Sequence, residues 1–356
     1  MLVRAAEGSP WARLLLAPPS VLYRGAVGLR NSLFDSGAFH AERLPVPVVS
    51  VGNITAGGTG KTPLVAAIAK ALAARGRKIA ILTRGYGGSG RFLVLRDGSN
   101  AGPEEAGDEP ILLARQVAGV PIVVGADRRR TGRIAVELGA EALLLDDGFQ
   151  HRWLWRDLDI VVIDACDPFG HYRLLPSGRL REPLTALGRA DVFVVTRSHP
   201  HDPLQTLCEV IRQYNPNAAL FRAFHRPVSF VPLAGGEEVP LEALRGEACG
   251  AFCGIGNPEA FRSDLQLLGV RMVLFEPFRD HHAYNANELV RLSRLAREAG
   301  AGHLITTEKD AVRIAAVKGF SPTASGLPLL ALRARCEIEQ EFFALVERAA
   351  LRGREG

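Results

Sequence analysis

A glycine-rich segment between an apolar run and a helix-forming run carries most of the recognisable chemistry in this chain of 356 residues. It follows the apolar residues 46–51, precedes the helix-forming residues 63–74, and consists of Thr55, Ala56, Gly57, Gly58, Thr59, Gly60, Lys61 and Thr62. Glycines let successive backbone N–H groups turn toward one anion, and the start of a helix adds its positive end. Lys61 can then reach the β- and γ-phosphates, and the Thr62 hydroxyl can hold Mg²⁺. The segment predicts binding of a nucleoside triphosphate.

One position departs from the general form of this loop. The pattern G-x-x-x-x-G-K-[ST] has glycine at the place that Thr55 occupies. The glycines at 57, 58 and 60 still give the loop its freedom, and Pro63 suits a first helical turn that has no use for its N–H. We therefore prefer a phosphate-binding loop to an ordinary glycine-rich turn before a helix.

Paired carboxylates end another apolar run, where Asp146 and Asp147 follow residues 143–145. An acid at a strand end beside the phosphate loop can reach the metal or its waters, since Mg²⁺ prefers oxygen ligands. Asp164, after residues 160–163, competes for this role. We favour the pair because two adjacent acids make a costly strand end unless cations neutralise them, although a cap or turn is the simpler interpretation.

Three further signals are weak when each is taken alone. Asp108 opens a helix after a glycine and would by default be its N-cap. Arg181 and Glu182 lie in a loop where such a pair is normally a surface salt bridge. His281 belongs to a loop segment in the second half of the chain, and loop histidines are more often structural than catalytic.

Bulk composition bounds the class of protein. A chain that is 47% hydrophobic and 356 residues long can bury a substantial core and form about two domains. The net charge of +5 is modest, and the densest basic group, residues 128–130, is typical of a solvated helix face, so we expect no nucleic-acid partner and no obligate protein partner. Five cysteines without a C-x-x-C pair favour a reducing compartment over disulfides or a zinc site.

The first 35 residues have a character of their own. We expect no spanning helix, because the chain has no run of about twenty apolar residues. A short helix over residues 11–16 is predicted to end at Pro18 and Pro19, and Ser20 can cap a second, amphipathic helix. The second helix has an apolar stripe, with Arg24 and Asn31 opposite, formed by Leu22, Ala26, Leu29 and Leu33 and widened by Tyr23, Val27 and Phe34. Four arginines against one acid suit a membrane interface, while packing on its own domain is the alternative.

The remaining chain alternates short apolar runs with helical segments. Predicted strands at 78–83, 92–95, 120–125, 142–145, 160–163 and 192–195 argue for a mainly parallel sheet covered on both faces, with ligands at the strands' carboxyl ends. Residues 220–224 and 228–231 read as extended segments about residues 225–227 and could form a ribbon between domains. A second α/β pattern follows from residue 250. We predict a P-loop NTPase-like α/β fold with an N-terminal segment 1–35, a nucleotide-binding domain 36–220 and a smaller α/β domain 221–356.

Taken together and in order, these motifs resemble a known family. Residues 51–63, 84–88, 107–110, 146–151, 181–183, 280–281 and 307–310 closely resemble the tetraacyldisaccharide 4'-kinases, the lipid A 4'-kinases of bacteria with an outer membrane. The resemblance runs from about residue 10 to about residue 345, and Thr55 looks like this family's own version of the loop.

The resemblance implies transfer of the γ-phosphate of ATP to the 4'-hydroxyl of a tetraacylated glucosamine disaccharide 1-phosphate, a lipid A precursor, giving lipid IVA. It implies a peripheral protein on the cytoplasmic face of the inner membrane. Lys61 and the loop amides would neutralise the phosphates with Mg²⁺, and Arg181 could contact the transferring group. We assign the metal to Thr62 with Asp146 or Asp147 and, additionally, Glu182. Asp108 resembles the family's candidate base, and His281 looks like its partner from the other domain, so catalysis would require domain closure.

Two other classes of function compete with this interpretation. A membrane-associated ATPase switch of the Min or Par type would also use a phosphate loop, but those proteins carry an extra lysine where this chain has Ala56. A soluble small-molecule kinase or ATP-dependent ligase would have no need of the amphipathic N-terminal segment.

Overall fold

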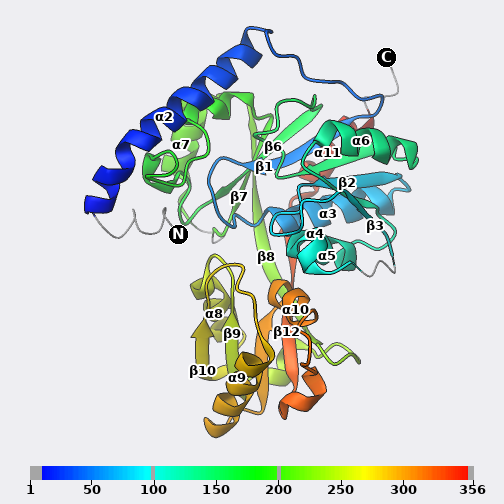
Figure 1. The fold of residues 1–356 in the computed structure, drawn as a ribbon, viewed down its shortest axis with the longest axis vertical. Coiled ribbons are helices and arrows are strands. Elements are labelled where there is room, and N and C mark those ends of the chain that lie inside the picture. The colour runs from blue at the N-terminus through cyan, green and yellow to red at the C-terminus, as the bar shows by residue number, and fades with distance from the viewer. Residues whose placement is uncertain (1–9, 98–100, 199–201, 352–356) are drawn as a thin grey trace.

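The computed structural model describes residues 10–97, 101–198 and 202–351, which form two α/β domains (Figure 1). The first domain contains β1 (Val48–Asn53), β2 (Ile79–Thr83), β3 (Leu93–Leu95), β4 (Ile122–Val124), β5 (Ala142–Asp146), β6 (Leu158–Asp164) and β7 (Val192–Thr196). The second contains β9 (Ala248–Cys253), β10 (Arg271–Pro277) and β11 (His303–Thr307). Two long strands, β8 (Ala219–Pro232) and β12 (Leu329–Ile338), run between them. Within the described residues, the strands form one sheet in the order β10-β9-β11-β12-β8-β7-β6-β1-β5-β2-β4-β3.

The first domain has the predicted, mainly parallel sheet. Strands β7, β6, β1, β5, β2 and β4 pair in parallel, and β3 adds an antiparallel edge. Every residue of β1, β2, β5, β6 and β7 is buried, as expected when helices cover both faces. One face packs on α3 (Lys61–Ala74), α5 (Asp108–Gln116) and α11 (Gln340–Leu351). The other packs on α6 (Arg128–Glu137), α7 (Gln205–Tyr214) and the 3₁₀ helix η2 (Leu184–Arg189).

The link between the domains is a two-stranded ribbon. Strand β8 pairs in parallel with β7 at one end and antiparallel with β12 along its length. The sequence suggested two extended segments about residues 225–227, whereas the structure has one continuous strand of 14 residues. Pro227 is tolerated because it lies where the register of β12 shifts between Arg333 and Ala334, and bulges are a usual place for proline in a sheet.

Helices α8 (Pro258–Leu267) and α9 (Ala286–Glu298) belong to the second domain alone. Two later helices, α10 (Glu308–Ile314) and α11, connect the second domain back to the first. Helix α10 lies against α5, and its Val312 joins the apolar core of the first domain. The last helix, α11, buries Phe342 in that same core. We predicted that residues 221–356 form the smaller domain, but residues 340–351 pack on the first domain.

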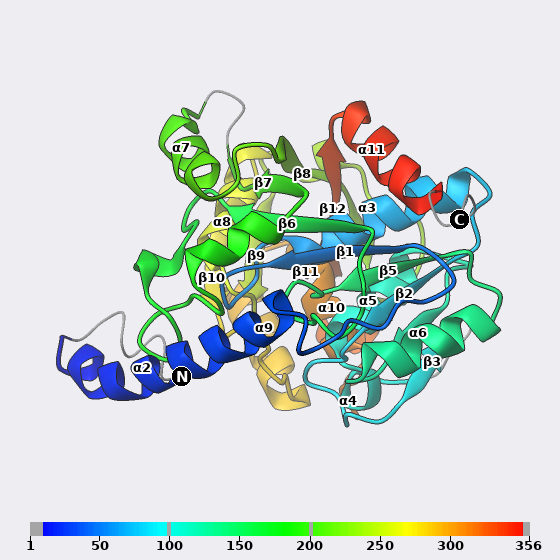
Figure 2. The same cartoon turned by 90° about the horizontal axis from the view of Figure 1, so that it is seen from above.

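The N-terminal segment is one helix, α2 (Pro10–Asp35), which lies along one side of the first domain (Figure 2). The prediction that Pro18 and Pro19 end a first helix is wrong, because both lie inside these 26 residues. Both prolines are exposed, so water can hydrate the carbonyls that lose their helical partners. None of the described helices combines the length and apolar character that a bilayer crossing needs.

Two faces of α2 have different environments. Val27 and Asn31 are buried and Tyr23 is half-buried against the first domain, so Asn31 lies on the face opposite Leu22 and Leu29 of the predicted stripe, as the sequence suggested. A separate row formed by Leu15, Leu22 and Leu29 is 78%, 76% and 64% exposed. The helix thus packs on its own domain and still presents an apolar row to its surroundings.

Candidate active site

The phosphate loop connects the end of β1 to the start of α3. Gly57 and Gly60 have backbone φ angles of 114° and 81°, a conformation that residues with a Cβ atom rarely adopt. A Cβ on Gly57 would lie 2.5 Å from the Arg179 guanidinium, and one on Gly60 would lie 2.7 Å from the His225 ring. Thr55 instead forms an antiparallel bridge with Leu180, an extended conformation that does not need glycine. This bridge explains the departure from the general pattern.

A neighbouring segment, residues 173–183, braces the loop. The Ala56 N–H donates to the Arg179 carbonyl at 2.6 Å, and Arg179 Nε donates to the Ala56 carbonyl at 3.0 Å. The Arg181 N–H donates to the Ile54 carbonyl at 2.8 Å. Helix α2 holds this segment in turn, because the Tyr23 hydroxyl donates to the Arg181 carbonyl at 2.8 Å. Contacts with α2 therefore reach the phosphate loop through residues 173–183.

Lys61 and Asp147 meet beside the loop, at the strand end where the sequence placed the paired acids. Lys61 Nζ donates to Asn53 Oδ1 at 3.1 Å and lies 3.4 Å from Asp147 Oδ1. Arg181 Nη1 contacts both Asp147 oxygens, at 2.9 and 2.8 Å. Burial alone would raise the pKa of Asp147, but the charges of Lys61 and Arg181 hold that pKa below its usual range. Asp147 is therefore ionised between two cations.

Asp146 has the opposite environment, although it is the adjacent residue. Its carboxylate is buried at the end of β5, where Oδ2 accepts a hydrogen bond from the Thr83 hydroxyl at 3.3 Å. Burial, reinforced by the charges of Glu109 and Asp147, raises the pKa of Asp146. A buried carboxylate without an adjacent ion-pair partner is costly unless a cation joins it. This strand end therefore suits a divalent cation.

Two other predicted or competing acids already have cationic partners. Glu182 is fully buried, and its carboxylate lies 3.1 Å from Arg30, 3.0 Å from Arg189 and 2.8 Å from Asn31 Nδ2. Its described contacts thus link α2 to η2, and none joins it to Thr62 or Asp146. Asp164 forms an ion pair with Arg197 and accepts from the Cys166 N–H at 3.0 Å. Within the described residues, no group of three or more His, Cys, Asp or Glu side chains is arranged to hold a metal ion.

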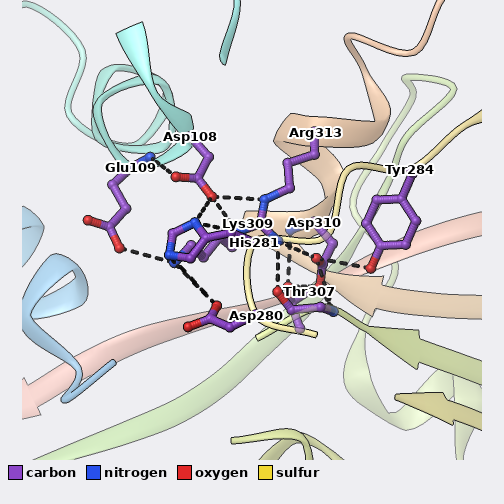
Figure 3. A network of polar contacts seen from close by, with 10 residues as sticks. Asp108, Glu109, Asp280, His281, Tyr284, Thr307, Lys309, Asp310 and Arg313 are labelled. Atoms are coloured by element: carbon purple, nitrogen blue, oxygen red, sulfur yellow. Dashed lines mark hydrogen bonds and ion pairs between the residues drawn. The ribbon is translucent and has the colours of Figure 1, made fainter. Parts of the chain in front are cut away.

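Asp108 and His281 come together from different domains, which confirms the predicted proximity (Figure 3). Asp108 is the first residue of α5 and not its N-cap, a place taken by Gly107, so the simpler interpretation of Asp108 as a cap is wrong. Its Oδ2 atom lies 3.1 Å from His281 Nδ1. Burial would raise the pKa of Asp108, but the hydrogen bond from His281 and the charges of Lys309 and Arg313 lower it well below its usual range.

The second domain's loops approach the phosphate loop. A Cβ placed on Gly256 would lie 3.3 Å from Asp280 Oδ2 and 3.7 Å from the backbone nitrogen of Gly58. His281 follows Asp280 directly, and its N–H donates to the Gly254 carbonyl at 3.1 Å. The Asp108–His281 pair and the loop that would hold a triphosphate therefore belong to one site.

Two cations of α10 complete this site, and the sequence analysis gave neither a role. Lys309 Nζ lies 3.0 Å from Glu109 Oε1 and 3.4 Å from His281 Nε2. Arg313 Nε donates to Asp108 Oδ2 at 2.8 Å. The sequence did contain one signal for this helix, because Thr307 with an acid three residues later, Asp310, is the pattern of a helix N-cap. A helix that starts there places Arg313 on the same face as Asp310.

Comparisons with known proteins identify the family of this chain. The sequence model of the tetraacyldisaccharide-1-P 4'-kinase family, LpxK, matches residues 12–350. A tetraacyldisaccharide 4'-kinase of Syntrophus aciditrophicus is 43% identical over 353 residues, covering 96% of this chain and 93% of the relative. Another from Anaeromyxobacter sp. (strain K) is 46% identical over 316 residues, covering 87% and 82%. The crystal structure of LpxK from Aquifex aeolicus in complex with ATP has a TM-score of 0.75 and 34% identity, covering 95% of this chain and 99% of that one.

Proposed function

This chain belongs to the tetraacyldisaccharide-1-P 4'-kinase family, and we propose that it transfers the γ-phosphate of ATP to the 4'-hydroxyl of a tetraacyldisaccharide 1-phosphate, giving lipid IVA. One observation supports this proposal above all: the phosphate loop of the first domain lies near the Asp108–His281 pair, to which each domain contributes one residue. The family match favours a kinase over an ATPase switch of the Min or Par type.

The phosphate loop supplies alignment and positive charge. Phosphoryl transfer asks little covalent chemistry of the protein, because the main task is to neutralise charge on the γ-phosphoryl oxygens. In our proposal, residues 55–62 bind the triphosphate through their backbone N–H groups, and Lys61 leaves Asp147 to contact the β- and γ-phosphates. Arg181 shares the Asp147 carboxylate with Lys61 and would contact the transferring group.

The residues present at the end of β5 fit Mg²⁺. When bound, magnesium would supply positive charge that neutralises the phosphates, and in proteins it is usually held by one or two carboxylates with a hydroxyl and waters. We propose Thr62 with Asp146 or Asp147 as its protein ligands, since Asp146 is buried and its pKa is raised despite the nearby charges of Lys61 and Arg128. Glu182 stays a predicted ligand that would first have to leave Arg30 and Arg189.

Asp108 and His281 would together remove the proton of the sugar hydroxyl. Because a carboxylate accepts and does not donate, the contact with Asp108 places a proton on His281 Nδ1. Positioned acid–base groups of this kind contribute on the order of 10²–10⁴-fold to a rate. The two domains must be docked for the pair to form, since Asp108 lies on α5 and His281 on a loop after β10.

Helix α2 supports a peripheral membrane location. We propose that its exposed row, Leu15, Leu22 and Leu29, enters the interface of the inner membrane on the cytoplasmic side, where a lipid substrate would be met.

Transfer of labelled phosphate from ATP to a detergent-dispersed tetraacyldisaccharide 1-phosphate tests the function. The native protein should form labelled lipid, and Lys61→Ala should not. Lys70→Ala is the matched control, because Lys70 is an exposed lysine of the same helix. Asp108→Ala should retain ATP affinity and lose about 10²–10⁴-fold of turnover. Absence of labelled lipid with the native protein, or native turnover by Lys61→Ala, would refute the proposal.

A further inference from the structure

A buried row of polar side chains runs from the second domain to Asp108 (Figure 3). The Tyr284 hydroxyl donates to Asp310 Oδ1 at 3.1 Å, and Arg313 Nη1 donates to the same oxygen at 2.9 Å. Arg313 then donates to Asp108 Oδ2 through both Nε, at 2.8 Å, and Nη2. Asp310, Arg313 and Asp108 are only 0%, 9% and 6% exposed. A single guanidinium thus joins two buried carboxylates that belong to different domains.

The geometry of this arginine is fixed on every side. Arg313 Nη1 also donates to the Gly254 carbonyl at 2.7 Å. Asp310 is itself held, because it accepts from the Gly254 N–H at 3.1 Å and from the Thr307 hydroxyl at 2.6 Å. A planar fork with five N–H donors can serve two carboxylates and a carbonyl at once, whereas an ammonium group is a compact point charge. The site therefore demands arginine and not merely a positive charge.

The consequence falls on Asp108. Its Oδ2 atom is contacted by Arg313 and by His281 Nδ1, while Oδ1 accepts from the Glu109 N–H at 3.0 Å. With Oδ2 occupied, the carboxylate cannot rotate without breaking the contact to His281. Rotation of His281 is restricted for the same reason, which keeps its Nε2 atom on the side of Lys309.

We propose that Arg313, itself held by Asp310, is the positioning residue that orients Asp108 against His281 when the two domains are docked. Arg313 does not need to touch the substrate in this role. The proposal rests on the proposed kinase function, because it assigns how that function's acid–base pair is kept in register.

The pH dependence of turnover distinguishes positioning from simple structural support. The titratable and charged groups that act on Asp108 are His281 on the loop after β10 and Lys309 and Arg313 on α10, with Asp310 behind Arg313. From its own helix, Glu109 contacts it through the backbone N–H. Removing a cation beside a carboxylate raises the pKa of that carboxylate. If turnover requires ionised Asp108, loss of Arg313 must move the acid limb of the kcat profile to higher pH.

The test replaces Arg313 in the full chain with methionine or lysine and measures labelled-phosphate transfer. We expect Arg313→Met to lose about 10- to 100-fold in kcat, the effect of a misplaced catalytic group, with KM for ATP unchanged. Its acid limb should move to higher pH. Arg313→Lys should recover only part of kcat, because lysine cannot bridge both carboxylates. Arg294→Met is the matched control, since Arg294 is a 65% exposed arginine on α9.

A double-mutant cycle with Asp108→Asn provides the second measurement. If Arg313 acts through Asp108, adding Arg313→Met to Asp108→Asn should lower kcat no further. The proposal would be overturned if the fold-losses of kcat in the two single variants multiplied in the double variant. It would also be overturned if Arg313→Met lost kcat equally at every pH, in proportion to its fraction of unfolded protein. If Arg313→Met does not fold, Asp310→Asn should lower kcat while KM for ATP stays unchanged, because Arg313 then loses the carboxylate that holds it, and a native kcat again overturns the proposal. Failure of the native protein to transfer phosphate would instead refute the proposed function.

Discussion

Replacing the exposed leucines of α2 is the sharpest test of the membrane proposal. Leu15, Leu22 and Leu29 recur every seven residues, lie along one row of the helix and are 78%, 76% and 64% exposed. Moving one leucine side chain from water to apolar surroundings contributes about 1.5–3 kcal/mol. Only the exposed 64–78% of each side chain can leave water, so changing all three to serine should remove about 3–6 kcal/mol of partition free energy. This corresponds to at least a ~100-fold weaker binding to membranes.

The assay is cosedimentation with vesicles that contain anionic phospholipids. Labelled-phosphate transfer in detergent and thermal denaturation should remain native, because this row points away from the first domain. The control is a Leu267→Ser, Val290→Ser variant, whose parent residues are 75% and 55% exposed on α8 and α9 of the second domain. Our reasoning is refuted if the α2 variant and this control bind vesicles as tightly as the native protein.

Three further predictions concern the site itself. Asp146→Asn should raise the melting temperature at pH 8 without nucleotide or metal, and this gain should shrink toward pH 5. The pKa of Asp146 is raised to about 7 in the folded protein, from about 3.9 in the unfolded chain. The native protein therefore loses stability as the pH rises through that range, whereas the variant does not. Glu182→Gln should cost about 3 kcal/mol in urea denaturation, because it leaves Arg189 without its buried partner, and a weaker Mg²⁺ affinity with native stability would instead support Glu182 as a metal ligand. Gly60→Ala should weaken ATP binding in calorimetry more than Gly76→Ala does, since both have φ near +80° but only Gly60 would contact His225; equal effects would contradict this contact.

Sequence reasoning located much of the site because several of its parts are local. The phosphate loop is a contiguous run from Thr55 to Thr62, and its strand and helix are adjacent in the chain. Asp146 and Asp147 could be placed at a strand end because an apolar run precedes them directly. Such features depend on neighbours within a few residues, which a single sequence displays.

Other parts could not be found in this way. Asp108 and Arg313 are 205 positions apart, and the pair exists only because α10 packs on α5. Two of the partners of Glu182, Arg30 and Asn31, come from α2, about 150 residues earlier in the chain. The pairing of Asp108 with His281 was expected from a family resemblance and not from any local pattern.

By itself, the sequence determined the phosphate loop, the alternation of strands and helices, and the acids at the strand ends, because backbone freedom and hydrophobic spacing act between near neighbours. Only the tertiary structure decided that α2 continues through Pro18 and Pro19, that β8 is one strand, and that Arg313 joins Asp310 to Asp108. These outcomes depend on solvent exposure, strand register and buried charge pairing. Those quantities arise from contacts between distant segments and exist only once the two domains are folded together.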